Sequence, residues 1–181
     1  MTSSELNLLK YPIGKFVKPE PISESQILEW IKTIEELPKH LSELTKNLSI
    51  EQLNFLYRPE GWSIKQVVHH LADSHINSLI RFKLTLTEDD PTIKPYHEDR
   101  WATLADGMDD NIIDSLTLLK SLHNKWTKLL LSLTPEDLKR VYIHPEHDKQ
   151  FSLQVAIGLY AWHSNHHLAH IEQGLKYNGK F

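Results

Sequence analysis

The sequence predicts an all-α protein, a four-helix bundle, and three observations support this fold class. Apolar residues recur at helical spacing along four long stretches of the chain. Serines that can act as N-caps precede three of these stretches. The segments between the stretches are polar and contain proline and glycine. Four amphipathic helices joined by loops bury their apolar stripes against one another, which gives a bundle.

The chain begins with a segment, residues 1–22, that contains four residues unfavourable to a helix: Pro12, Gly14, Pro19 and Pro21. We therefore expect an extended N-terminal arm here, followed by one domain over residues 23–181. The first long helix should begin at Ser23 or Ser25 and run to about Asn47, with a kink at Pro38.

The second helix is expected over residues 63–87, because Ser63 is a strong N-cap candidate and an apolar stripe follows it. A polar connection, residues 88–109, comes next and contains Pro91, Pro95 and Gly107. Extended chain covers about 3.3 Å per residue, so this connection can cross the full length of a bundle. Such a crossover allows a helix order other than simple up-down-up-down.

The third helix is expected over residues 110–132, followed by a short turn in which Thr134 acts as the cap. Residues 140–151 can form a small hairpin. The last helix should begin at Ser152 and run to about Asn178, with Gly179 as its stop.

Composition excludes several classes of function. The formal net charge is −4, so no basic excess indicates binding to nucleic acid or to an anionic membrane surface. No apolar run approaches the roughly 20 residues that a membrane span requires, and the first residues lack an apolar signal core. We therefore expect a cytoplasmic protein. The chain has no cysteine, so a metal would need nitrogen and oxygen ligands.

Histidines are numerous and unevenly distributed. The chain has 12, and the last helix continues its apolar stripe through His163, His166, His167 and His170. Imidazoles at positions i and i+4 can both reach one ion at about 2.0–2.1 Å. The pairs His163/His167 and His166/His170 both satisfy this spacing, so spacing alone does not choose between them.

The second helix offers His69, His70 and His75 as a third ligand. Periodicity favours His75, because it lies at the centre of the apolar stripe, whereas His69 and His70 lie to either side of it. Three histidines would leave one position on the metal for water or substrate. The remaining histidines have a simpler interpretation as surface or hydrogen-bonded polar residues: His40, His97, His123, His144 and His147. A hydrogen-bonded histidine network without metal is the alternative for the clusters themselves.

Four segments carry a family resemblance: GWSIKQVVHHLADSH, RFKLTLTEDDPTIKPY, EDRWATLAD and WHSNHHLAHI. Together they resemble the DinB/YfiT-like metalloenzymes, closest to the YfiT-type metal-dependent hydrolases. The resemblance implies a four-helix bundle with a long connection between helices two and three. It implies His70, His163 and His167 as metal ligands, with zinc or nickel as the ion. Four residues then become candidates for supporting or pocket roles: Asp73, His75, His166 and His170.

The resemblance leaves three functions open. A hydrolase would use metal-bound water as its nucleophile, with Asp73, Glu98, Asp99 or a spare histidine moving the proton. A thiol S-transferase would add an external low-molecular-weight thiol to an electrophile, with Arg58, Arg81 or Arg100 holding an anionic cosubstrate. A non-enzymatic stress protein would only bind metal. Either enzyme would act on a small molecule, and proteins of this kind are often homodimers, so we expect a homodimer.

Overall fold

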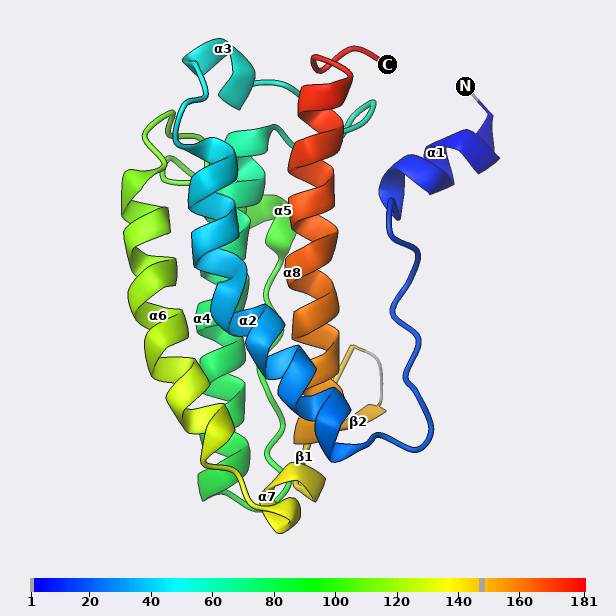
Figure 1. Ribbon diagram of the computed structural model, residues 1–181, viewed down its shortest axis with the longest axis vertical. Helices are drawn as coiled ribbons and strands as arrows, with labels where there is room; N and C mark the ends of the chain where they lie inside the picture. The colour runs from blue at the N-terminus through cyan, green and yellow to red at the C-terminus, as the bar shows by residue number, and fades with distance from the viewer. Residues whose placement is uncertain (1, 147–148) are drawn as a thin grey trace.

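The computed structural model describes residues 2–146 and 149–181, and four long helices dominate it (Figure 1). These are α2 (Glu24–Thr45), α4 (Ile64–Thr87), α6 (Ile113–Leu131) and α8 (Leu153–Lys176). The shorter elements are α1 (Ser3–Lys10), α3 (Ile50–Leu53), α5 (Glu98–Trp101), α7 (Pro135–Lys139), β1 (Val141–His144) and β2 (Lys149–Ser152). The predicted four-helix bundle is confirmed, and the two strands form the expected small antiparallel hairpin.

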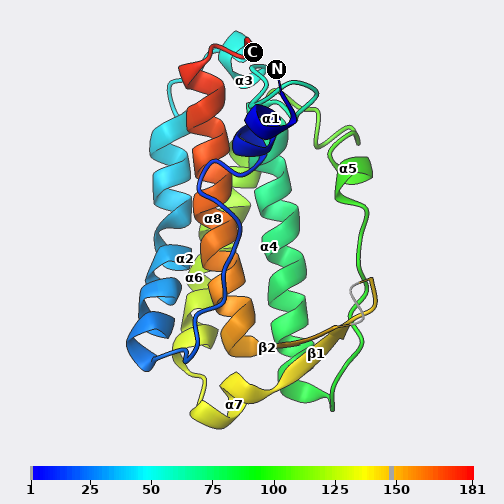
Figure 2. The ribbon, with the colours of Figure 1, turned by 90° about the vertical axis from the view of Figure 1, so that its right-hand side faces the viewer.

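The directions of the helices make the long connection between α4 and α6 necessary. Helix α2 packs against α6 and α8, and α4 packs against the same two helices, so α2 and α4 occupy opposite corners. In Figure 1, α2 and α8 run upward, whereas α4 and α6 run downward. After α4 the chain therefore has to return along the bundle before α6 begins, and Figure 2 shows it doing so through α5. The bundle is not a simple up-down-up-down arrangement.

The helix caps explain why the helices begin where they do. The Ser63 side chain accepts a hydrogen bond from the Gln66 backbone N–H, and the Gln66 side chain accepts one from the Ser63 N–H. This capping box satisfies backbone donors that would otherwise lack partners at the start of α4. At the start of α2 the Ser23 side chain accepts a hydrogen bond from the Gln26 backbone N–H. Both caps agree with the sequence prediction.

The predicted extended arm is wrong for its first half. Residues Ser3–Lys10 form helix α1, which begins with a capping box between Thr2 and Glu5. The prolines that suggested extended chain begin only at Pro12, so nothing prevents a helix before that point. The rest of the segment, residues 11–22, is without helix or strand and runs along α8 (Figure 2).

The apolar core has two parts separated by a layer of histidines. One part is centred on Phe82, Trp126 and Ile157, and the other on Leu71, Leu119 and Ile171. Along α4 the boundary falls near His75, and along α8 it falls at residues 163–170. The histidines of α4 and α8 therefore lie between the two apolar clusters, midway along the bundle. Among the described residues, no helix combines the length and the apolar character needed to cross a membrane.

Candidate metal centre

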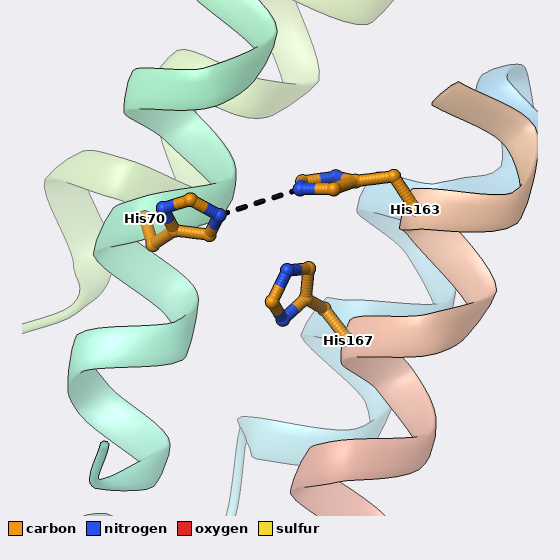
Figure 3. A group of neighbouring side chains, drawn as sticks. All are labelled: His70, His163 and His167. Atoms are coloured by element: carbon orange, nitrogen blue, oxygen red, sulfur yellow. Dashed lines mark hydrogen bonds between the residues drawn. The ribbon is translucent and has the colours of Figure 1, made fainter. Parts of the chain in front are cut away.

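Three histidine side chains from two helices converge between α4 and α8 (Figure 3). His70 comes from α4, and His163 and His167 come from successive turns of α8. One ring nitrogen from each lies within 4.8 Å of the other two. The Nε2 atoms of His70 and His163 are 3.3 Å apart. The residues implied by the family resemblance are therefore brought together by the tertiary structure.

The donor set fits a divalent transition-metal ion. Two nitrogens bound to one tetrahedral ion at about 2.0–2.1 Å lie about 3.3–3.4 Å apart, which matches the separation of the His70 and His163 nitrogens. The third nitrogen needs a small shift to complete the set, because the group spans up to 4.8 Å. Neutral imidazole nitrogen is a good ligand for zinc and nickel.

Burial keeps the three rings neutral, as metal ligation requires. His70 and His167 are each 7–8% exposed. Burial lowers the pKa of His70 to about 4, with a smaller contribution from His166. Burial also holds the pKa of His163 and of His167 well below the ordinary value for histidine. At neutral pH the lone pairs are therefore available to a metal.

A cavity of about 790 Å³ opens against the three rings. Several aromatic side chains line it, and Trp62 packs on His70 with 4.7 Å between the ring centroids. Tyr57, Tyr96, Tyr142, Tyr160, Phe151 and Trp162 also line it. Charged side chains stand among these rings: Lys10, Arg58, Glu60, Arg81, Glu98, Asp99 and Glu146. The cavity can accept a small molecule with both apolar and polar parts.

The N-terminal segment forms one side of the site. The Lys10 carbonyl oxygen accepts a hydrogen bond from His170 Nε2 at 3.1 Å, and the Trp162 Nε1–H donates to the Gly14 carbonyl at 3.0 Å. Tyr11 lies 6.0 Å from the His166 ring. These contacts fix residues 10–14 against the histidine-bearing face of α8. The N-terminal segment, which we expected to be an extended arm, therefore contributes to the candidate site.

The other candidate histidines surround the three rings. His75 is completely buried, and its Nε2 lies 3.2 Å from His163 Nδ1. His170 Nδ1 lies 3.4 Å from His167 Nδ1. His166 stacks on Trp162, with centroids 4.4 Å apart, and lines the cavity. Periodicity favoured His75 as the third ligand, whereas the histidine of α4 that groups with His163 and His167 is His70. His75 instead lies on the Nδ1 side of His163.

Asp73, the candidate carboxylate of α4, lies three residues after His70. It is half buried and does not line the cavity, whereas Ser74, the next residue, does. Successive helical residues are rotated by about 100°, so Asp73 points in a different direction from Ser74. Burial, reinforced by Asp106, raises the pKa of Asp73 to about 6. Of the candidate carboxylates, Glu98 and Asp99 on α5 line the cavity.

The remaining candidate histidines and arginines that the structure describes are either exposed, buried in the core or part of the cavity wall. His40 and His97 are exposed, as the simpler interpretation predicted. His123 is buried and hydrogen-bonded, whereas His144 lines the cavity. His147 lies outside the described residues. Of the candidate arginines, Arg58 and Arg81 line the cavity, but Arg100 is exposed and does not.

Sequence reasoning missed the tyrosines. Arg58 Nε donates to the Tyr57 hydroxyl at 3.2 Å, and Arg81 Nη1 donates to the Tyr160 hydroxyl at 3.4 Å. Tyr160 precedes His163 by three positions, so helical spacing placed both on one face and could have indicated it. No comparable signal existed for Tyr57, Tyr96 or Tyr142, which come from loops and a strand distant in the sequence.

Comparison with known proteins gives a consistent result. The DinB superfamily model matches residues 33–171. A Bacillus cereus (strain ATCC 10987 / NRS 248) protein named "Putative metal-dependent hydrolase" is 52% identical over 166 residues, covering 92% of this chain and 95% of that protein. A Bacillus anthracis (strain CDC 684 / NRRL 3495) protein of the same name is 51% identical over the same shares.

A solved structure agrees with these relatives. YfiT from Bacillus subtilis is described as "a probable metal-dependent hydrolase with an unusual four-helix bundle topology". It superposes with a TM-score of 0.92 at 46% sequence identity, covering 95% of this chain and 98% of that one. With the family model spanning most of the chain and relatives above 50% identity, this chain belongs to the DinB superfamily.

Proposed function

We propose that this protein is a metal-dependent hydrolase that holds one divalent ion, zinc or nickel, through His70, His163 and His167. One observation carries the proposal: ring nitrogens of two buried histidines and one partly buried histidine, from two helices, converge at the wall of a cavity. Three protein ligands leave a coordination position for water or substrate, which is typical of catalytic sites and not of structural ones. The names of the Bacillus relatives support the same reaction class.

The chain's own residues would bind and orient the substrate. A bound ion would supply Lewis-acid polarisation and lower the pKa of water. The aromatic side chains of the cavity wall would hold the apolar part of a small substrate. Arg58 and Arg81 can hold an anionic group, and Glu98 or Asp99 can accept a proton.

The first test is metal content. Protein purified without a histidine tag is analysed by elemental mass spectrometry, comparing wild type with His163→Ala. The control is His40→Ala, which removes an exposed histidine of α2. We expect about one zinc or nickel per chain in wild type and control, and loss of the ion in His163→Ala. No metal in wild type, and no uptake on adding zinc or nickel, would refute the proposal.

The second test separates hydrolysis from thiol transfer. Metal-loaded protein is assayed against panels of esters, amides and lactones, then against a model electrophile with and without added thiols. Hydrolysis that requires the metal and no thiol supports the proposal. Electrophile consumption that requires a thiol, with no hydrolysis, would favour the S-transferase instead. Inactivity in both assays despite bound metal would favour a non-enzymatic metal-binding role.

A further inference from the structure

We propose that two hydrogen-bonded relays of histidines, each ending at a backbone carbonyl oxygen, hold His163 and His167 with their Nε2 lone pairs directed at the metal position. His75, His123 and His170 would then be positioning residues that decide the tautomers of the ligands. This inference rests on the metal site proposed above, but it concerns the chain's own protons and can be tested without activity.

The first relay passes through the core. His123 Nδ1 is hydrogen-bonded to the Ile34 carbonyl oxygen, which can only accept, so His123 Nδ1 carries the proton. His123 Nε2 must then accept from His75 Nδ1, 2.8 Å away. His75 Nε2 is left as an acceptor, and it lies 3.2 Å from His163 Nδ1. His163 therefore carries its proton on Nδ1, and its Nε2 lone pair faces His70.

Burial keeps His75 and His123 neutral, and for neutral rings the Ile34 carbonyl oxygen allows only this direction of the relay. His75 and His123 are 0% and 1% exposed, so water has no access to reorganise their bonds. Their other described ring contacts are aromatic: Trp126 meets both edge-on, and Tyr160 meets His75. A proton added to either ring would place an uncompensated charge in the centre of the bundle, which is strongly unfavourable.

The second relay passes through the N-terminal segment. His170 Nε2 is hydrogen-bonded to the Lys10 carbonyl oxygen at 3.1 Å, so this nitrogen carries the proton. His170 Nδ1 can then accept from His167 Nδ1, 3.4 Å away. The remaining nitrogen of His167, Nε2, is the one that Figure 3 shows directed toward the gap between His70 and His163. Tyr57 stacks on His170 at 3.9 Å and keeps its ring in place.

The two relays fix the same tautomer, with the proton on Nδ1, in His163 and in His167. Each α8 ligand has its Nδ1 proton bound, so its Nε2 lone pair is directed at the site before any ion arrives. In the metal-free protein His70 Nε2 would then donate to His163 Nε2, since two lone pairs cannot face each other at 3.3 Å. To hold an ion through Nε2, His70 would carry its proton on Nδ1 instead, so that all three Nε2 lone pairs face the site.

The direct experiment reads the tautomers of the full-length, metal-free protein. Protein labelled with ¹⁵N-histidine is examined at neutral pH by long-range ¹H–¹⁵N correlation, with signals assigned by single-histidine variants. We expect the Nδ1–H tautomer for His75, His123, His163 and His167, and the Nε2–H tautomer for His170 and His70. A proton on Nε2 of His163 or His167 in the metal-free protein would overturn the proposal.

A variant experiment tests the consequence for the metal. Zinc affinity is measured by chelator competition, and the visible spectrum is recorded with cobalt(II) in place of zinc. His75→Leu leaves the His163 Nδ1–H without its acceptor, so we expect zinc affinity to fall about 10–100-fold and the cobalt spectrum to change. His75→Gln supplies an amide oxygen and should recover part of the loss. His40→Ala should match wild type in both measurements.

The outcomes separate this inference from the proposed function. A folded His75→Leu protein with wild-type zinc affinity and cobalt spectrum would overturn the relay. If His75→Leu fails to fold, the tautomers of the wild-type protein still decide. Absence of hydrolysis with normal metal binding would count against the hydrolase but leave both relay measurements unchanged.

Discussion

The Nε2 atoms of His70 and His163 face each other at 3.3 Å across the gap between α4 and α8. The two helices run antiparallel, and they bring together residues that are 93 positions apart. Because a shared ion would link the helices at mid-bundle, the metal should contribute to stability as well as to chemistry.

Metal removal should therefore lower the melting temperature. An ion present at a hundredfold excess over its dissociation constant adds roughly 2.7 kcal/mol to the free energy of unfolding. For a chain of this length that corresponds to about 5–10 °C in Tm. Differential scanning calorimetry with and without chelator checks this. His70→Ala should melt at one temperature in both conditions, and a chelator effect that persists in this variant would place the ion elsewhere.

Acid should destabilise the metal-free protein. Burial lowers the pKa of His123 to about 4 in the folded state, whereas an unfolded histidine titrates near 6.5. Between these values the unfolded chain binds a proton that the folded chain does not, so the free energy of unfolding falls as the pH falls. The contribution is full above about pH 6.5 and is lost progressively toward pH 4, at roughly 1 kcal/mol per pH unit for each such histidine.

Urea unfolding of metal-free protein at several pH values between 4 and 7 measures this slope. His123→Gln should retain a hydrogen-bonding side chain yet show a shallower dependence, because one buried titrating group is gone. His97→Gln, at an exposed position, is the control and should keep the wild-type slope. Equal slopes in all three proteins would contradict the assignment to His123.

Gly107 should not tolerate a side chain. A Cβ at this buried position would lie 2.9 Å from the Trp101 carbonyl oxygen and 3.1 Å from the Ala102 backbone. Neither backbone group can move without shifting α5, which carries Glu98 and Asp99. We expect Gly107→Ala to destabilise the protein by about 1–3 kcal/mol, measured by urea unfolding. The exposed neighbouring substitution Ala105→Ser should change stability by less than about 0.5 kcal/mol.

The N-cap of α4, the helix that carries His70, should contribute measurably to the free energy of unfolding. Ser63→Ala removes the acceptor for the Gln66 N–H and should cost about 1 kcal/mol of unfolding free energy. Ser63→Asp keeps an acceptor and should restore most of the loss. Equilibrium denaturation of the three proteins tests the pair. Equal losses in Ala and Asp variants would mean that burial of the small hydroxyl, and not capping, matters at this position.

Local chemistry written in the sequence explains which elements could be predicted. Ser23 and Ser63 are caps whose partners lie three residues away, so the starts of α2 and α4 follow from short-range pattern. The length of the connection, residues 88–109, predicted a crossover. Helix α1 was missed because the prolines from Pro12 onward were given weight over the Thr2–Glu5 capping box that precedes them.

The sequence by itself determined the four helices, the histidine-rich face of α8 and, through family resemblance, the three histidines of the candidate site. Only the tertiary structure decided how the other histidines are used. Spacing along α8 cannot distinguish His163/His167 from His166/His170, because both pairs are one helical turn apart. The difference lies in what faces them: His70 from α4 meets the first pair, whereas Lys10 and Tyr57, distant in the sequence, hold His170. Contacts between segments remote in the chain leave no local pattern, so they follow only from the packing of the bundle.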